Sequence, residues 1–226
     1  MQRRSLTVLS GLVCLAGLAA ACGGSADSAE DAAADAAVPA ETAATEQASA
    51  LESLRATTER FADVNAALAA GYIPDPSGMC ITAAMEGQPV ENGNMGIHYL
   101  RPDLLGLLPP EGRVNGTGMH MDFDDPGVLL YEPQADGSMR LVGIENLVWA
   151  QPWQAAGNAG APEFMGEEYV YMIDDPATEA DEAHGFEPHY ELHVWIHQEN
   201  PRGVFTPFNP AVTCDHATHA PAAGAP

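Results

Sequence analysis

Lysine is absent from this sequence, so arginine supplies all of its strongly basic side chains. Eight basic residues stand against 32 acidic ones, which gives a formal net charge of −24. The lack of lysine excludes Schiff-base enzymes, a P-loop lysine and a lysine general base. A surface this anionic would also repel a phosphate backbone, because the binding of nucleic acid depends on Lys and Arg side chains that neutralise the phosphates. We therefore expect no nucleic-acid partner and regard cations as the natural ligands.

A hydrophobic run long enough to predict a membrane span is also missing near the start of the chain. Residues 6–21 are apolar but rich in small side chains, and they follow Arg3 and Arg4, as in a secretory signal peptide. The small residues before Cys22 resemble the lipobox of bacterial lipoproteins, whose cysteine carries the lipid. Ala19 stands where leucine is usual, so cleavage without lipidation is the alternative. We expect an exported bacterial protein, anchored to the membrane through lipid on Cys22 and facing the periplasm or the cell exterior.

Aromatic residues are missing from residues 23–45, which consist mainly of Ala, Asp, Glu, Ser and Thr. Such a segment buries too little apolar area to offset the entropy lost on ordering. This composition therefore predicts a disordered tether over residues 22–47. It follows the predicted signal peptide, which spans residues 1–21. One globular, β-rich domain should follow over residues 48–216, with a flexible tail over residues 217–226.

Apolar side chains at three-, four- and seven-residue steps predict a helix at the start of the domain. They are Leu51, Leu54, Phe61 and Leu68, and Thr58 lies on the same stripe. Gly71 and Pro74 are suited to end this helix. We expect its apolar stripe to pack on a sheet, and a partner-binding helix is the alternative.

The rest of the domain has the composition of strands separated by turns. Residues 95–100, 127–132, 139–149 and 189–198 are rich in β-branched and aromatic side chains. The middle two runs form a hairpin in this interpretation, because Asp136-Gly137 between them supplies a residue for positive φ. Residues 150–185 should be an irregular surface loop with one short strand over residues 169–173. The predicted fold class is α+β and β-rich, with the N-terminal amphipathic helix on an antiparallel sheet or small barrel and with long loops.

Cysteine is scarce, since only Cys80 and Cys214 remain beyond the predicted signal and lipidation site. Outside the cytoplasm an even pair is most simply one disulfide bond. Closing so long a loop would stabilise the fold by about 4 to 5 kcal/mol in the chain-entropy model. A cysteine metal ligand is the alternative, although no Cys-x-x-Cys spacing is present.

Histidine is concentrated late in the chain, where six of the eight lie between His184 and His219. At period two, one face of the run 189–198 is apolar and the other presents His189, Glu191, His193, Trp195 and His197. Strand residues four apart are separated by about 13 Å, so His189 and His193 cannot share an ion, whereas Glu191 and His193 can. In a helix, the three histidines would instead stack at one-turn spacing. The alternation and the following Asn200-Pro201 favour the strand.

A strand-borne metal site needs ligands from other strands, and two residues have suitable chemistry. Glu145 is a carboxylate in an otherwise apolar run, and His98 lies near Gly96, which permits close approach of a neighbouring chain. With His193 they would make a two-His-one-carboxylate set for a transition metal such as Fe, Zn or Mn. Hydrogen-bonded core residues without a metal are the alternative interpretation.

Further residues extend this predicted site. Glu191, His189 and His197 are possible additional ligands, and Tyr99 and Trp195 would line the side that a small ligand or substrate occupies.

A weaker alternative metal site is the segment Met119-His120-Met121-Asp122. Thioether and imidazole together suit Cu(I), whereas the nearby aspartates suit a hard cation such as Ca²⁺. The aspartates lack the spacing of an EF-hand loop, and ordinary packing is the alternative role for the methionines.

Several motifs in order resemble an uncharacterised family of exported bacterial proteins. They are residues 95–99 (MGIHY), 141–145 (LVGIE), 192–195 (LHVW) and the run from Asn209-Pro210 to Cys214. The resemblance implies export and supports His98, Glu145 and His193 as a set, but it implies no activity. Asn146 stands where the family has an aromatic residue, a difference that bears on the pocket wall.

Two functions of different classes follow from these residues. The first is an extracytoplasmic metal- or small-ligand-binding lipoprotein, and the second is a metal-dependent enzyme acting on a small extracytoplasmic substrate. The sequence contains no nucleophile elbow, zincin helix or dinucleotide-binding loop, so hydrolase and dehydrogenase assignments have no support. We favour binding, and whether the protein is an enzyme stays open at this point.

Overall fold

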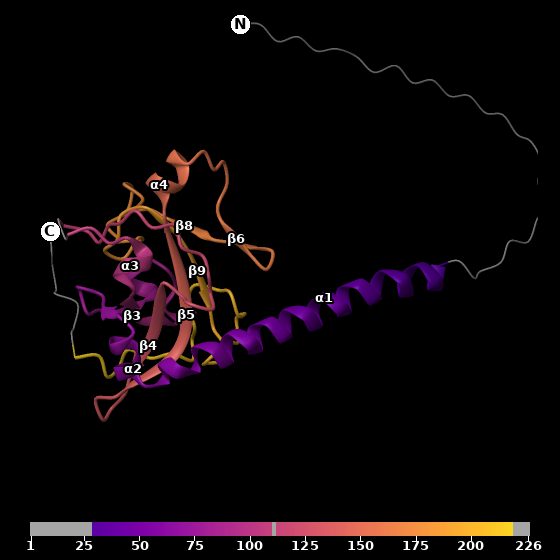
Figure 1. Ribbon diagram of the computed structural model, residues 1–226, viewed down its shortest axis with the longest axis horizontal. Helices are drawn as coiled ribbons and strands as arrows, with labels where there is room; N and C mark the ends of the chain where they lie inside the picture. The colour runs from indigo at the N-terminus through magenta and orange to yellow at the C-terminus, as the bar shows by residue number, and fades with distance from the viewer. Residues whose placement is uncertain (1–28, 110–111, 219–226) are drawn as a thin grey trace, which may run out of the picture. The chain divides into compact units, whose positions relative to one another are not determined.

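The computed structural model of this chain describes residues 29–109 and 112–218. The chain divides into two units, Met1–Ala43 and Ala44–Pro226. In the first unit the described residues belong to helix α1 (Ala29–Thr58), whose bounds cross into the second unit (Figure 1). The predicted signal peptide and Cys22 lie outside the described residues.

The helical region differs from the sequence-based prediction at both ends. Helix α1 begins at Ala29 rather than near residue 48, so residues 29–47 are helical where a disordered tether was expected. Their high alanine content explains the difference, because alanine has the highest helix propensity.

The predicted single helix is also divided into three pieces. Helix α1 ends at Thr58, a 3₁₀ turn η1 spans Glu59–Ala62, and α2 spans Val64–Ala69. Asp63 starts α2 as its N-cap, with its carboxylate accepting a hydrogen bond from the Asn65 amide. This break turns Leu68 partly to solvent, although the helical stripe placed it in the core.

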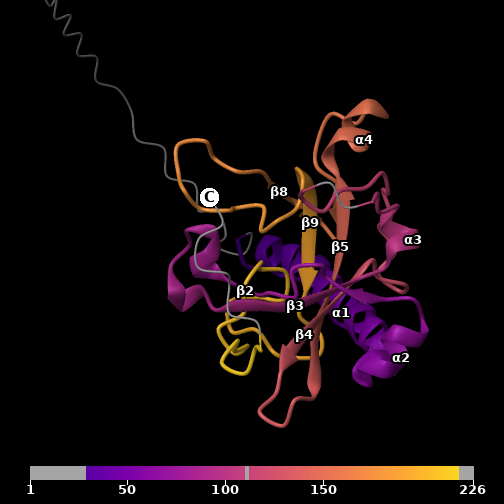
Figure 2. The same cartoon turned by 90° about the vertical axis from the view of Figure 1, so that its left-hand side faces the viewer.

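An open seven-stranded antiparallel sheet forms the main structure, which confirms the predicted α+β, β-rich fold class. Its order is β1-β3-β4-β5-β9-β8, and β2 also pairs with β3. The strands are β1 (Ile73–Pro74), β2 (Cys80–Thr82), β3 (Asn94–Leu100), β4 (Val128–Pro133), β5 (Met139–Trp149), β8 (Val170–Met172) and β9 (His189–Val194). Figure 2 shows β4, β5 and β9 side by side. The pairing of β5 with β9 aligns side chains from distant parts of the chain on one face.

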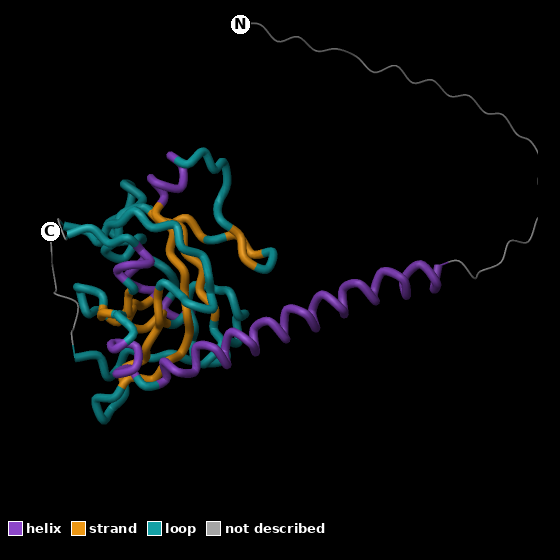
Figure 3. The backbone as a smooth tube through the Cα atoms, viewed as in Figure 1, coloured by secondary structure: helices purple, strands orange, loops and turns teal. Residues whose placement is uncertain are grey.

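Short helices and loops make up the rest of the domain (Figure 3). The helical turns are η2 (Ala83–Glu86), η3 (Val90–Asn92), α3 (Pro102–Leu105) and α4 (Ala150–Ala155). Strands β6 (Glu163–Phe164) and β7 (Glu167–Glu168) form a separate two-stranded ribbon.

The predicted hairpin is present, with β4 and β5 joined through residues 134–138. Gly137 adopts φ +83°, and the Gln134 amide donates to the Ser138 carbonyl across the turn. Strand β9, in contrast, ends at Val194 and not at residue 198. Beyond Val194 the chain leaves the strand, and the Trp195 amide donates to the Val204 carbonyl.

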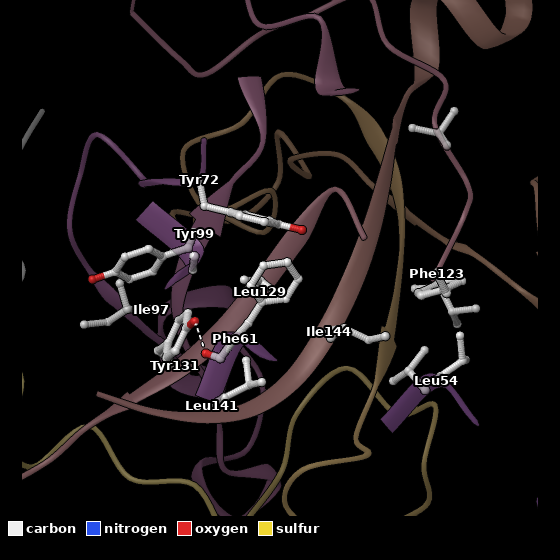
Figure 4. Packing of buried hydrophobic residues seen from close by; sticks show 14 of the residues in the cluster. Leu54, Phe61, Tyr72, Ile97, Tyr99, Phe123, Leu129, Tyr131, Leu141 and Ile144 are labelled. Carbon is white, nitrogen blue, oxygen red and sulfur yellow. Dashed lines mark hydrogen bonds between the residues drawn. The ribbon is translucent and has the colours of Figure 1, made fainter. Parts of the chain in front are cut away.

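The two faces of the sheet bury different sets of side chains. One face packs against the helical segment, where the Tyr131 hydroxyl donates to the Phe61 carbonyl at 2.6 Å (Figure 4). On the other face Trp149 donates its indole N–H to the Leu105 carbonyl of α3, and Phe186 packs beside it. This second face also carries the polar side chains described below.

A disulfide bond joins Cys80 in β2 to Cys214 near the C-terminal end of the described chain. The pairing confirms the prediction from cysteine count. It connects residues 134 positions apart in sequence, and it ties the segment after β9 to the strand that pairs with β3.

Candidate metal centre

Histidine and glutamate side chains gather beneath the second face of the sheet, where each is at most 4% exposed. The members are His98, Glu145, His189, Glu191 and His193 on strands, with Glu86 from η2 and His184 from the loop before β9. Water is almost wholly excluded from this cluster. Every charge or polar atom in it must therefore find a partner inside the protein.

The pairing of β5 with β9 brings the first group together. Glu145 lies directly opposite His193, and its Oε2 is 3.5 Å from His193 Nε2. His98 reaches the same oxygen from β3, with its Nε2 at 3.2 Å. One ligand atom from each of the three residues lies within 4.8 Å of the others. The structure thus brings together the trio predicted from sequence, using three different strands.

Glycines make this arrangement possible at two places. Gly96 has φ +100°, and a Cβ there would lie 2.7 Å from the Tyr131 carbonyl oxygen, so β4 can approach β3 closely beside His98. A Cβ on Gly143 would lie 3.1 Å from a ring carbon of Trp195. That free space lets Trp195 stack on His193, with ring centroids 5.9 Å apart.

A second group adjoins the first and consists of His184, His189 and Glu191. Glu191 Oε2 lies 3.2 Å from His189 Nε2 and 3.7 Å from His184 Nε2. The other oxygen of Glu191 lies 3.7 Å from His193 Nδ1, so this carboxylate contacts both groups. His189 and His193 belong to different groups, as the strand spacing of about 13 Å requires.

Two members of the cluster were missed by sequence reasoning. His184 falls in the stretch predicted as an irregular surface loop, and Glu86 lies in a 3₁₀ turn without strand periodicity. The end of that loop is in fact interior, since Ala183, His184 and Phe186 are buried. The available signal was local: an apolar, glycine-containing sequence around His184 within an otherwise acidic stretch.

Many polar atoms of the cluster make no hydrogen bond within the described part of the chain. They include both ring nitrogens of His98 and His184, both oxygens of Glu145, His193 Nε2 and one oxygen each of Glu86 and Glu191. The close contacts between them lack hydrogen-bond geometry. Unpaired buried polar atoms are rare and costly in folded proteins, and a ligand bound among these atoms would satisfy them.

Mutual attraction governs the pKa values in the first group. Burial alone would lower the pKa of His98, but the neighbouring Glu145 carboxylate raises it overall. Burial alone would raise the pKa of Glu145, but the imidazoles of His193 and His98 lower it overall. Positive charge is therefore favoured next to the Glu145 carboxylate. A metal cation can supply this charge in place of a proton on a neighbouring imidazole.

Burial, together with neighbouring negative charge, governs the pKa of Glu86. Burial, followed by repulsion from the Glu191 carboxylate, raises the pKa of Glu86 to about 10. Burial lowers the pKa of His184 well below its ordinary value. The second group thus contains a neutral imidazole, which is the form that can ligate a metal ion.

Aromatic rings enclose the cluster. Phe186 contacts the rings of His98, His184 and His189, with centroid distances of 5.2–6.4 Å. Trp195, predicted to line the site, stacks on His193 and donates its indole N–H to the Thr206 carbonyl at 2.6 Å. These apolar walls strengthen electrostatic interactions inside the cluster by lowering the local dielectric.

Three residues expected near the site lie elsewhere. Tyr99 follows His98 and so points to the opposite face of β3, where its ring packs 4.8 Å from that of Tyr131. Asn146 follows Glu145 and accepts a hydrogen bond from the Gly127 amide, so it does not form the predicted pocket wall. His197 lies beyond the end of β9, and its Nε2 bonds the Thr58 hydroxyl at 2.8 Å.

In the weaker alternative site, neither His120 nor Asp122 belongs to a group of three His, Cys, Asp or Glu side chains with metal-ligand spacing among the described residues. Met119 and Met121 are exposed, and His120 Nε2 bonds the carbonyl oxygen of Asp125. Asp122 accepts a hydrogen bond from the Asp124 amide within the same turn. The segment is an exposed turn held by local hydrogen bonds.

Comparison of the chain with protein-family models, with curated proteins and with solved structures found no match. Among the helices in the described ranges, none combines the length and apolar character needed to cross a bilayer. The functional argument therefore rests on the geometry of the cluster.

Proposed function

We propose that this protein is an extracytoplasmic metal-binding protein and that His98, Glu145 and His193 hold its ion. The observation that carries the proposal is the convergence of these three side chains from β3, β5 and β9. Each is at most 1% exposed, and their facing atoms lack hydrogen bonds. A divalent cation would satisfy these atoms at once and neutralise the buried carboxylate.

The contact distances also suit ligation. Donor atoms about 2.0–2.2 Å from one ion lie roughly 3–4 Å from each other. The contacts of Glu145 Oε2 with His98 Nε2 and His193 Nε2 are 3.2 and 3.5 Å. Two imidazoles and a carboxylate favour Zn, Fe or Mn, whereas Cu(I) prefers the sulfur ligands that this group lacks.

Export is part of the same proposal. It rests on the signal-like residues 1–21 and on the lipobox-like sequence before Cys22. The disulfide between Cys80 and Cys214 supports it, since such bonds persist mainly in oxidising compartments. Lipidation of Cys22 and the resemblance to an exported bacterial family stay predictions.

Metal content tests the proposed ion site. Untagged protein from metal-replete cells should retain metal through gel filtration, and Glu145→Gln and His193→Gln should each lose at least one equivalent as measured by elemental mass spectrometry. The matched control is His120→Gln, which removes a histidine of the exposed turn and should keep the wild-type content. Wild-type protein that contains no metal, even after incubation with excess Zn²⁺, Fe²⁺ or Mn²⁺, would contradict the proposal.

A cavity next to the cluster favours a second candidate function, a metal-dependent enzyme with a small anionic substrate. The cavity has a volume of about 280 Å³, and Glu86, Met172, Arg202 and Phe208 are among its lining residues. Among the described arginines, Arg202 alone has no carboxylate within 4 Å of its guanidinium. In so acidic a protein, an unpaired arginine at a cavity is suited to bind a carboxylate or similar anion.

Acetate is a simple probe for this second function. If a substrate anion reaches the metal from the cavity, acetate should change the visible spectrum of the Co²⁺-loaded protein, and Arg202→Gln should weaken this binding about tenfold or more. Arg55→Gln is a matched control, since Arg55 pairs with Glu52 on α1 and does not line the cavity. A spectrum that acetate leaves unchanged would favour the purely metal-binding function.

A further inference from the structure

The second group of the cluster has its own features of a metal site. His184, His189 and Glu191 are buried, and one ligand atom of each lies within 4.8 Å of the others. The group has the same composition as the first, two imidazoles and one carboxylate. Their contacts with the first group are one oxygen of Glu191 beside His193 and the His184 ring stacked on that of His98, and neither contact takes a ligand atom away from the first group.

The orientation of His189 prepares it for ligation. Its Nδ1 lies 2.9 Å from the Glu187 carbonyl oxygen, which can only accept, so Nδ1 carries the proton. Its Nε2 points at Glu191 Oε2, 3.2 Å away, where the two atoms share a hydrogen bond. A metal ion bound by Nε2 and Oε2 would take the place of the proton in that hydrogen bond.

His184 and His193 repeat this pattern. His184 Nδ1 lies 3.1 Å from Glu86 Oε1 while its Nε2 faces Glu191, and His193 Nδ1 lies 3.7 Å from Glu191 Oε1 while its Nε2 faces Glu145. In each ring one nitrogen faces an oxygen acceptor and the other faces a candidate ligand. Metal-ligating histidines are oriented in this way by outer carboxylates and carbonyls.

The backbone at His184 is also held in an uncommon conformation. Its φ is +37°, and the ring lies against that of His98 with centroids 5.4 Å apart. A left-handed conformation is unfavourable for a residue other than glycine and persists where the surroundings require it. Here it aims both ring nitrogens into the cluster, where neither makes a hydrogen bond.

We propose that the centre holds two metal ions, the second one bound by His184, His189 and Glu191. This inference rests on the proposed function for the first ion. Glu191 links the two positions, because its Oε2 ligates the second ion while its Oε1 orients His193, a ligand of the first. Glu86 is a positioning residue for His184, and it also lines the cavity, so the second ion is the one closer to an entering small ligand.

The test is a titration of the full-length, metal-free protein with Co²⁺, followed by its visible spectrum and by equilibrium dialysis. The wild type should bind two equivalents. Glu145→Gln and His189→Gln should each bind one, and the double variant should bind none. Glu191→Gln should lose the second ion and weaken the first about tenfold or more, because His193 loses its outer-shell partner.

Controls keep the result interpretable. His120→Gln should bind two equivalents, and circular dichroism of each variant should match the wild type; the wild-type stoichiometry remains informative if a variant fails to fold. One equivalent in the wild type, lost in Glu145→Gln and unaffected by His189→Gln, would overturn the second ion and leave the proposed function intact. Two equivalents in His189→Gln would overturn this assignment of the second ion, and no bound metal in the wild type would overturn both.

Discussion

Replacing both Cys80 and Cys214 by alanine should lower the free energy of unfolding by about 5 kcal/mol. The disulfide joins residues 134 positions apart, and the entropy that such a cross-link removes from the unfolded chain grows with loop length. Because the whole stability of a domain is typically about 5–15 kcal/mol, the variant should be close to unfolding at growth temperature. Urea denaturation, with the midpoint and slope fitted together, measures the difference.

Reduction of the wild-type protein provides the control for this result. Excess reductant should destabilise the wild type by a similar amount and should leave the double alanine variant unchanged. A loss below about 1 kcal/mol would mean that the denatured chain is already constrained without the cross-link. In that case the bond would contribute to the position of β2 beside β3 more than to stability.

Chelation of bound metal should produce the second large effect. At a free metal concentration a thousandfold above Kd, binding to the folded protein alone adds about 4 kcal/mol to stability. A chelator should remove this contribution from the wild type and lower its Tm. Glu145→Ala and His193→Ala should lose less stability on chelation than the wild type does, because each variant already lacks the first ion.

With metal in excess, the losses of stability caused by these two substitutions should also be non-additive. Once Glu145→Ala has emptied the first ion position, adding His193→Ala should cost little more, whereas independent sites add. His120→Ala should keep the full response to chelator. Equal chelator responses in wild type and both single variants, with additive losses of stability, would show that Glu145 and His193 are structural residues.

The strands that carry the candidate site could be predicted because their signal is local. Alternation at period two placed His189, Glu191 and His193 on one face of β9, and the structure buries all three on that face. The strand rise likewise separated His189 from His193, which now belong to different groups. The prediction failed beyond Val194, where the alternation continues in the sequence but β9 ends and His197 turns to the helical segment.

Residues off the strands could not be predicted in the same way. His184 and Glu86 reach the cluster from a loop and a 3₁₀ turn, where no repeating pattern relates a residue to a face. Tyr99 shows the converse error: its chemistry suited a ligand pocket, but its position next to His98 puts it on the other side of the sheet.

By itself the sequence determined the acidic character, the lack of lysine chemistry and the strand runs, and it predicted the disulfide between Cys80 and Cys214 that the structure contains. These depend on composition, on period and on count, and none requires knowledge of distant contacts. Only the tertiary structure decided that Glu145 faces His193, that His98 reaches them, and that His184 with Glu86 completes a second group. The register between strands, and the positions at which loops come back against the sheet, are set by packing between residues far apart in the chain. A local sequence pattern does not encode such packing.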